Sequence, residues 1–289
     1  MMIDLERALL AICARNRDGS YSTQANRRAI LSLAARDLVK LGFYNLSPLG
    51  VKPKHVEALV RRWQEQGLGV GTLKNRLAHL RWWAEKVNKA SVIARDNAHY
   101  GIENRVYVTN RSKALQVSAE QLAKIKDERL RCSVELQRAF GLRREECLKF
   151  QPAYAIRDDH IRLKPSWTKG GKARTVPVRT EDQRAVLAQA RKLAGSGSMI
   201  PPELSYKDQL NRYTAAVAAA GLSKLHGLRH EYAQRRYAEL TGWPAPALGG
   251  PNTKALSPLQ KAKDQEARLM ISRELGHERE QITAVYLGR

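Results

Sequence analysis

The sequence has few cysteines and no long apolar run. Its three cysteines, Cys13, Cys132 and Cys147, lie far apart and form no CxxC pair. They indicate neither a disulfide framework nor a thiolate zinc site, and we expect buried, reduced thiols. No apolar stretch approaches the ~20 residues that a membrane span needs, and the charged side chains within residues 1–17 do not fit a signal peptide. We therefore expect a cytoplasmic protein without a membrane partner.

Acidic side chains are also in short supply. The 289 residues include 51 Lys and Arg against 28 Asp and Glu, which gives a formal net charge of +23. Such an excess binds a polyanion through counterion release, and nucleic acid is the commonest polyanion in cytoplasm. A hydrophobic fraction of 43% argues against wholesale disorder. Because the charge is not gathered in a low-complexity tail, we expect a folded nucleic-acid-binding protein.

The first third of the chain shows helical periodicity. Apolar spacing predicts helices from Ser22 to Leu41, from about Lys54, and from Thr72 onward. Residues 1–107 should therefore form a helical domain, and a polar, basic linker at 108–116 should follow it. The third helix carries polar side chains that are candidate DNA contacts, although a solvated helix face explains them equally well. These side chains are Lys74, Asn75, Arg76 and Arg81.

Residues 117–289 are predicted to form a second, mostly helical domain. A capping signature, Ser118 to Gln121, starts its first helix. Alternating apolar residues and turn residues predict a three-stranded antiparallel sheet over 154–178, with one turn at 168–171. The helical pattern that follows is interrupted by a Pro/Gly-rich stretch, which begins an insertion at about residues 243–268.

Two arginines occupy positions on apolar helix stripes. Arg143 lies on one predicted stripe and Arg229 on another. An inward guanidinium is costly unless it is paired or faces a cleft that binds an anion. Glu146, three residues after Arg143, could form a private ion pair with it, and this is the structural alternative. His226 precedes Arg229 by three residues, at the expected start of the helix.

Three further side chains are candidates whose commoner role is structural. Lys169 projects from the turn at 168–171, where lysines are usually solvated. His277 closes a helix in Leu275-Gly276-His277. Tyr286 lies in register with Ile282, where a core aromatic is the usual occupant.

Taken in order, these residues resemble the active-site series of the tyrosine recombinases, the phage-integrase superfamily. The order, the local context and the spacing from His277 to Tyr286 all agree, and the match covers Val117 to Arg289. The N-terminal helices resemble the core-binding domain of that family in a more generic way. The series consists of Arg143 in GLRREE, Lys169 in TKGGKARTVPV, His226 and Arg229 in HGLRH, His277 in LGH, and Tyr286 in ITAVY.

The resemblance implies a fold, an activity and partners. The fold is mainly α with a small antiparallel β-sheet in the catalytic domain, and the two domains form a C-shaped clamp. The activity is site-specific recombination through a 3′-phosphotyrosine, as in the integrase of a mobile element. The partner is double-stranded DNA with a specific recombination site. The chain is expected to be a monomer in solution, to form a homotetramer on DNA, and to be associated with the nucleoid. No metal or cofactor is implied.

Phosphodiester transesterification suits these residue types. Tyr286 can be a nucleophile that holds the phosphoryl group. Arg143 and Arg229 can each donate paired N–H groups to the non-bridging oxygens, a geometry that lysine does not supply. Glu146 would hold Arg143 or His226 in place.

Other roles come from the resemblance and from position along the chain. The family's general acid falls on Lys169, and His226 and His277 would hydrogen-bond the phosphate or help to deprotonate the tyrosine. Lys172 and Arg174 follow Lys169 in the basic turn and are candidate DNA contacts.

Three other functions remain open at this point. A type IB topoisomerase shares the tyrosine chemistry, and a DNA-binding regulator could retain the residues of a decayed site. A nuclease or transposase that uses carboxylates and a metal is disfavoured, because Asp158 and Asp159 sit in a turn and no motif places a third acid.

Overall fold

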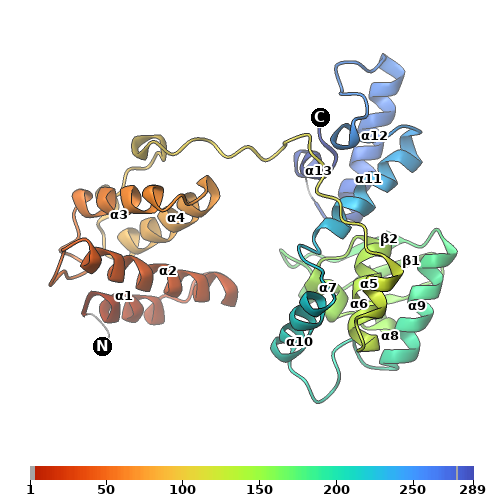
Figure 1. Ribbon diagram of the computed structural model, residues 1–289, viewed down its shortest axis with the longest axis horizontal. Helices are drawn as coiled ribbons and strands as arrows, with labels where there is room; N and C mark the ends of the chain where they lie inside the picture. Colours follow the sequence, from red (N-terminus) through yellow and green to blue (C-terminus); the bar gives the residue numbers. More distant parts are fainter. Residues whose placement is uncertain (1–3, 278) are drawn as a thin grey trace. The chain divides into compact units, whose positions relative to one another are not determined.

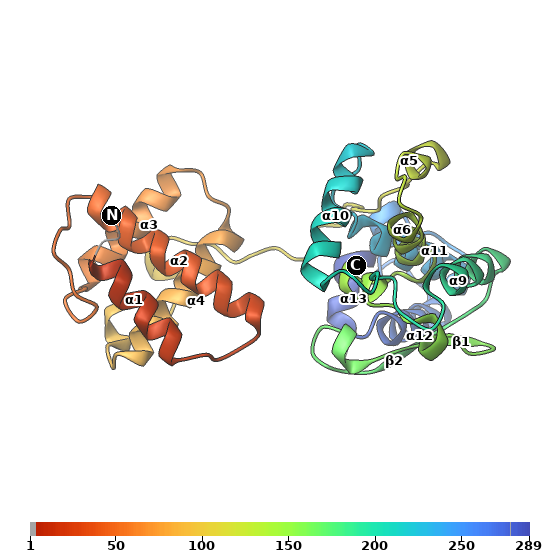
Figure 2. The same ribbon diagram turned by 90° about the horizontal axis from the view of Figure 1, so that it is seen from below.

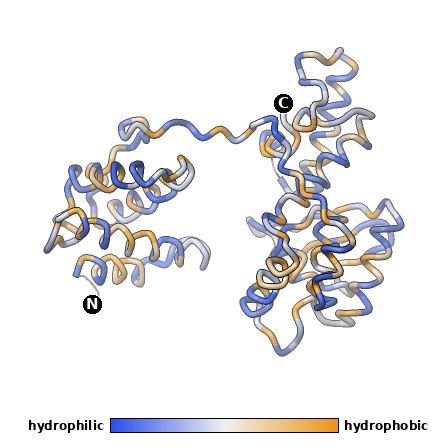
Figure 3. The backbone as a smooth tube through the Cα atoms, viewed as in Figure 1, coloured by the Kyte–Doolittle hydropathy of each residue, from blue (hydrophilic) through white to orange (hydrophobic). Residues whose placement is uncertain are grey.

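The computed structural model describes residues 4–277 and 279–289, which belong to two compact units (Figure 1). The division falls between Val106 and Tyr107. The described residues are mainly helical with a small antiparallel sheet, so the predicted fold class is confirmed. Hydrophobic and hydrophilic residues alternate along the tube of each unit (Figure 3). No helix in the described part of the chain is long and apolar enough to cross a membrane.

The first unit is a bundle of amphipathic helices around one core, which Figure 2 shows from below. The helix predicted from Ser22 begins at Tyr21 instead, because the hydroxyl of Ser20, and not that of Ser22, accepts the capping hydrogen bond from Thr23 N. The core includes Leu31, Leu59, Trp63, Leu77 and Trp83. The elements are α1 (Asp4–Arg15), α2 (Tyr21–Lys40), α3 (Pro53–Glu65), α4 (Val70–Lys86), η1 (Ala90–Val92) and η2 (Ala98–Tyr100).

The second unit packs helices against one another and against the sheet. Its α6 contacts α9 and α11, and α12 contacts α11, α13 and the strand β2. The elements are α5 (Ala119–Ala123), α6 (Glu128–Phe140), α7 (Arg144–Leu148), α8 (Pro152–Ala155), β1 (His160–Leu163), η3 (Pro165–Trp167), β2 (Arg174–Pro177), α9 (Glu181–Ala194), α10 (Tyr206–Ala219), α11 (Gly227–Thr241), η4 (Pro246–Leu248), α12 (Pro258–Glu274) and α13 (Glu280–Leu287).

The expectation of three strands over 154–178 was wrong. Among the described residues the sheet has two strands, β1 and β2, which pair antiparallel from His160↔Pro177 to Leu163↔Arg174. The first expected strand is the short helix α8, with Pro152 at its first position, where proline costs no hydrogen bond. Ile156, just after it, forms only an isolated bridge with Ile161.

The expected linker and the expected insertion are both packed parts of the second unit. The expected linker at 108–116 lies in that unit, and the Leu115 N–H donates to Gly227 O at 3.1 Å. The insertion at 243–268 is a loop that contains η4 and continues into α12. Ala267 and Ile271 on α12 are buried, so this helix contributes to the core.

Gly141 ends α6 in the left-handed conformation, with φ +60°, and its carbonyl accepts from Arg229. A Cβ there would lie 2.6 Å from the Tyr232 ring, so the site needs glycine for space as well as for φ. Gly242, at the end of α11, shares the left-handed conformation, but a Cβ there would meet no other atom within 4 Å.

We expect Gly141→Ala to destabilise the protein more than Gly242→Ala does. Both variants carry the left-handed strain of roughly 1–2 kcal/mol, and Gly141→Ala adds about 1–3 kcal/mol of overpacking against Tyr232. Urea unfolding of both variants measures the difference. Equal free energies of unfolding would contradict the crowding seen around Gly141.

Candidate active site

A cavity of about 1660 Å³ in the second unit brings together residues that are far apart in the sequence. Most of the sequence-predicted residues that line this cavity are arginine, lysine or histidine. Of the candidates named from the sequence, Arg143, Lys169, Lys172, Arg174, His226, His277 and Tyr286 line it.

Tyr286 on α13 is buried with its hydroxyl directed at α11. The hydroxyl lies 3.2 Å from His226 Nε2 and accepts a hydrogen bond from Arg229 Nε at 3.4 Å. Its ring packs between those of His230, with centroids 4.5 Å apart, and His277, at 5.4 Å. Tyr286 is therefore held by hydrogen bonds at its oxygen and by rings on its faces, which a simple core aromatic would not require.

Arg229 is 1% exposed and is fixed by main-chain carbonyls at two helix ends. It donates from one terminal nitrogen to Gly141 O at 2.5 Å, and from the other to Leu275 O. The second nitrogen also lies 3.3 Å from His277 Nε2. Burial and the charge of Arg143 lower the pKa of Arg229 to about 10, so the guanidinium stays charged at neutral pH.

Glu146 is the carboxylate around which the arginines gather. It is fully buried and accepts from Arg143 twice, from the main-chain N at 2.7 Å and from the side chain at 2.9 Å. Arg174 donates two parallel hydrogen bonds to it, at 2.7 and 2.6 Å. Burial by itself would raise the pKa of Glu146, but Arg174, together with the charges of Arg229 and Arg143, lowers it to about 2.

These contacts settle the geometry of two predicted residues. The Arg143–Glu146 pair exists, but it is shared with Arg174 rather than private, and Arg143 still lines the cavity. The candidate DNA contact Arg174 is turned toward Glu146: its side chain is 6% exposed and bound to that carboxylate, and it still lines the cavity. It also donates from Nε to Glu274 O at 3.0 Å, which ties β2 to the end of α12.

Lys169 and Lys172 lie on the exposed turn between the strands. Gly170 and Gly171 take the positive φ values, 90° and 67°, that close this turn. Both lysines line the same cavity as Tyr286, so the turn brings a flexible cation to the rim of the site.

The three histidines around Tyr286 are neutral at pH 7. Burial lowers the pKa of His277 to about 3 and that of His230 to about 4, and it lowers the pKa of His226 as well. Nearby arginines add to the effect at His277 and His226. A neutral imidazole has a ring nitrogen that can accept a proton, and the ring becomes positively charged when it does so.

Sequence reasoning missed several side chains that support the site. His230, four residues after His226 on α11, packs against the Tyr286 ring, and helical spacing could have found it. Glu274 accepts from Tyr232 at 2.7 Å and from Arg179. Gln234 donates to the main-chain O of Tyr286. The partners of Glu274 and Gln234 are distant in sequence, so no local signal marks them.

The candidates on α4 are not brought into this cavity. Lys74 donates to Asn104 at 3.3 Å, and Asn75 is exposed. The guanidinium of Arg76 lies 4.8 Å from the Trp63 ring centroid, and burial lowers its pKa.

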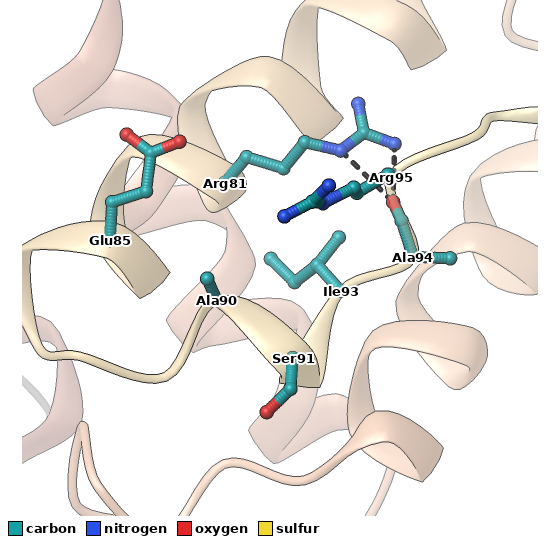
Figure 4. Close-up of a pocket in the computed structure, with 7 residues that line it drawn as sticks. All are labelled: Arg81, Glu85, Ala90, Ser91, Ile93, Ala94 and Arg95. Carbon is teal, nitrogen blue, oxygen red and sulfur yellow. Dashed lines mark hydrogen bonds between the residues drawn. The ribbon is translucent and has the colours of Figure 1, made fainter.

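Arg81 also turns toward its own unit. It donates twice to Ala94 O, at 3.1 and 2.8 Å, beside a cavity of about 460 Å³ (Figure 4). A third hydrogen bond, 2.9 Å long, reaches Asn97. The Arg81 side chain therefore fixes the loop after α4.

Comparisons with known proteins identify relatives for both units. The family model described as phage integrase, N-terminal, matches residues 2–90, and the model described as integrase matches residues 105–235. No curated protein sequence matches the chain.

Solved structures share the fold over nearly the whole chain. A lambda integrase tetramer bound to a Holliday junction is 16% identical with a TM-score of 0.59, covering 99% of this chain and 77% of that chain. The XerH site-specific recombinase bound to palindromic difH substrate is 16% identical with a TM-score of 0.61, covering 98% and 81%. The Tn1549 transposon integrase in complex with circular intermediate DNA is 15% identical with a TM-score of 0.57, covering 99% and 96%.

The buried neutral histidines should make stability depend on pH. Their pKa values are lower in the folded chain than the ordinary 6.5, so the unfolded chain binds more protons between about pH 4 and 6.5. The free energy of unfolding is therefore expected to fall as pH is lowered from 7 to 5, as urea unfolding can measure. His230→Gln should flatten this dependence, because it removes one of the buried imidazoles. An unchanged slope in His230→Gln would contradict the neutral, buried imidazole.

Proposed function

The chain belongs to the tyrosine recombinase (phage integrase) superfamily, and from that membership we propose that it is a site-specific DNA recombinase, the integrase of a mobile element. The observation that carries the proposal is the Tyr286 hydroxyl held by His226 and Arg229 at the wall of a basic cavity. It is the arrangement of a nucleophile with a proton acceptor and a phosphate-binding cation at the same atom.

In the cleavage step the Tyr286 oxygen attacks phosphorus. A P–O bond forms to the tyrosine, leaving a 3′-phosphotyrosine, and the P–O bond to the 5′ oxygen breaks. The tyrosine proton passes to His226, whose Nε2 lies 3.2 Å from the hydroxyl. The departing 5′ oxygen takes a proton from Lys169, which the turn between β1 and β2 carries at the rim of the cavity.

The arginines stabilise the negative charge on the phosphate. In the pentacoordinate transition state, Arg143 and Arg229 donate to the non-bridging oxygens, with Glu146 holding Arg143 in place. Arg229 Nε now donates to the Tyr286 hydroxyl, so a phosphate that enters beside the tyrosine meets a donor already directed toward the reacting atoms. Attack by the freed 5′ hydroxyl of another strand reverses the step and rejoins DNA without ATP, because the phosphotyrosine conserves the bond energy.

The proposed partner is double-stranded DNA that contains a specific recombination site. We propose that the chain works as a homotetramer on two duplexes and is a monomer in solution, associated with the nucleoid in the cell. The structural similarity to a lambda integrase tetramer bound to a Holliday junction supports this assembly. The formal charge of +23 supports tight, salt-dependent binding to phosphates.

A type IB topoisomerase is the alternative that shares the chemistry. It relaxes supercoils as a monomer, whereas a recombinase needs its own site and its own partners. Relaxation of plasmids without such a site distinguishes the two. A decayed regulator is disfavoured by the intact contacts of Tyr286 with His226 and Arg229.

The nucleophile is tested by Tyr286→Phe, which removes one oxygen. Trapping with a nicked substrate should yield a covalent protein–DNA adduct with the wild-type chain and none with the variant, while DNA affinity stays within about twofold because the ring contacts remain. Sequencing the DNA in the adduct identifies the recombination site. An adduct at normal yield from Tyr286→Phe would disprove the assignment.

Lys169 and Arg143 should respond differently to a better leaving group. A substrate with sulfur in place of the bridging 5′ oxygen leaves without a proton, so it should restore cleavage to Lys169→Ala. It should not restore Arg143→Ala, which lacks a transition-state donor, a loss of about 2.7–4 kcal/mol in comparable sites. Single-turnover cleavage rates on both substrates measure this. Failure of both variants on the sulfur substrate would show that Lys169 is not the acid.

A further inference from the structure

The segment that follows the first unit lies beside the helix that carries Tyr286 (Figure 1). Tyr107 and Val108 line the cavity of the candidate active site. Asn110 then binds the main chain of Arg289 on both sides: it donates to Arg289 O at 3.2 Å and accepts from Arg289 N at 2.8 Å. A Cβ on Gly288 would come within 2.7 Å of Asn110 Oδ1, so the close approach needs glycine.

Two residues farther on, the segment is linked to Tyr286 through one side chain, that of Gln234. Ser112 Oγ donates to Gln234 Oε1 at 2.9 Å, and Gln234 Nε2 donates to the main-chain O of Tyr286 at 2.8 Å. Gln234 is 2% exposed, so its amide cannot exchange these partners for water at low cost. A hydrogen-bond relay thus runs from the connecting segment to the backbone of the nucleophile.

The same segment also touches the start of α11. Leu115 N donates to Gly227 O at 3.1 Å, and a Cβ on Gly227 would lie 2.7 Å from Leu115 Cβ. Gly227 follows His226 directly, and Gln234 lies on the same helix. One helix therefore presents both the groups that bind the Tyr286 hydroxyl and the amide that binds the Tyr286 carbonyl.

The helix α13 depends on such outside contacts for its position. It spans Glu280–Leu287, and its N-cap, Arg279, makes no side-chain capping bond. So short a helix has little stability of its own, and its register on α11 is set by tertiary contacts. A shift of about 1 Å in the nucleophile can cost roughly 100-fold in rate.

We propose that Gln234 and Ser112 are positioning residues for Tyr286, and that the peptide connecting the two units thereby helps to set the geometry of strand cleavage. This inference rests on the proposed recombinase function. Gln234 holds the main chain of the nucleophile at the distance from His226 and Arg229 at which its hydroxyl meets both. Ser112 orients the Gln234 amide so that its NH₂ group faces the Tyr286 carbonyl.

The decisive variant is Gln234→Glu in the full chain. It keeps the size of the side chain and an acceptor for Ser112, but it replaces the donor to Tyr286 O by an oxygen. We expect the single-turnover cleavage rate to fall about 10- to 100-fold, with DNA affinity within about twofold of wild type. The sulfur-bridged substrate that rescues Lys169→Ala should not rescue Gln234→Glu, because the defect lies in the nucleophile.

Gln209→Glu is the matched control. Gln209 is also a buried glutamine of the second unit and donates to a main-chain carbonyl, Met199 O at 3.2 Å, but it lies on α10 and does not contact Tyr286. It should lose stability without slowing cleavage by the folded fraction. Ser112→Ala, at an exposed residue that folding tolerates, should slow cleavage several-fold, and Ser112→Thr should restore the rate by returning the hydroxyl.

The outcomes separate the inference from the function beneath it. If the wild-type chain forms adduct and Gln234→Glu cleaves at the wild-type rate, the positioning role is overturned and the recombinase function stands. The same holds if Gln209→Glu slows cleavage as much as Gln234→Glu does, since both glutamines would then be structural only. If the wild-type chain forms no adduct on any site-bearing DNA, the proposed function fails and the inference fails with it.

Discussion

The rest of the site depends on one buried carboxylate, that of Glu146. Arg143 and Arg174 are both bound to it, and Arg229 lies close enough for its charge to lower the pKa of the same group. Three guanidinium groups in a region of low polarity would otherwise repel one another and be costly to desolvate. Because Glu146 stays ionised down to about pH 2, it offsets part of this charge and leaves a net positive site. The cavity therefore attracts a phosphate and still permits the protein to fold around it.

Main-chain carbonyls at two helix ends also stabilise the buried positive charge. Arg229 donates to Gly141 O, at the end of α6, and to Leu275 O, at the end of α12. The last carbonyls of a helix have no partner within the helix and carry the negative end of its dipole, so a buried guanidinium satisfies them. The Tyr232 ring packs against Gly141 in the space that a Cβ would need. Gly141 thus contributes both to close packing, against Tyr232, and to the binding of the Arg229 guanidinium.

The sequence identified the candidate active-site residues more fully than the side chains that hold them in place. Arg143, His226, Arg229 and Tyr286 lie in local motifs, and the structure brings them together. Arg143 does not continue a helix stripe as the apolar spacing predicted, because Gly141 ends α6 and Arg143 is the N-cap of α7. Arg174 was a candidate DNA contact because it follows Lys169 in the basic turn. Its pairing with Glu146 was not predictable, since the two residues are 28 apart along the chain and no local pattern links them.

In the fold, too, local features were predictable from the sequence and features that depend on distant residues were not. Amphipathic helices were predictable from apolar spacing, as on α3, where Val56, Leu59, Val60 and Trp63 are buried. The missing third strand was not, because Pro152 fits a helix start as well as a turn before a strand. Nor was the docking of the segment at 108–116 predictable, since its polar composition is typical of a solvated linker while Asn110 and Ser112 bind groups brought near only by the tertiary fold.

In this site the positive charge lies on arginines, whereas the groups that can accept a proton are neutral histidines. Burial and the nearby arginines lower the pKa of His277 to about 3 and that of His230 to about 4, so a fall in pH to 6 leaves these two imidazoles beside Tyr286 neutral. Arg229, whose pKa is lowered to about 10, carries a positive charge at neutral pH. In the proposed reaction, a neutral His226 accepts the Tyr286 proton while Arg229, whose Nε already donates to the hydroxyl, stabilises the phenolate. The buried environment that lowers the pKa of the histidines is thus the same one that makes the arginine contacts strong.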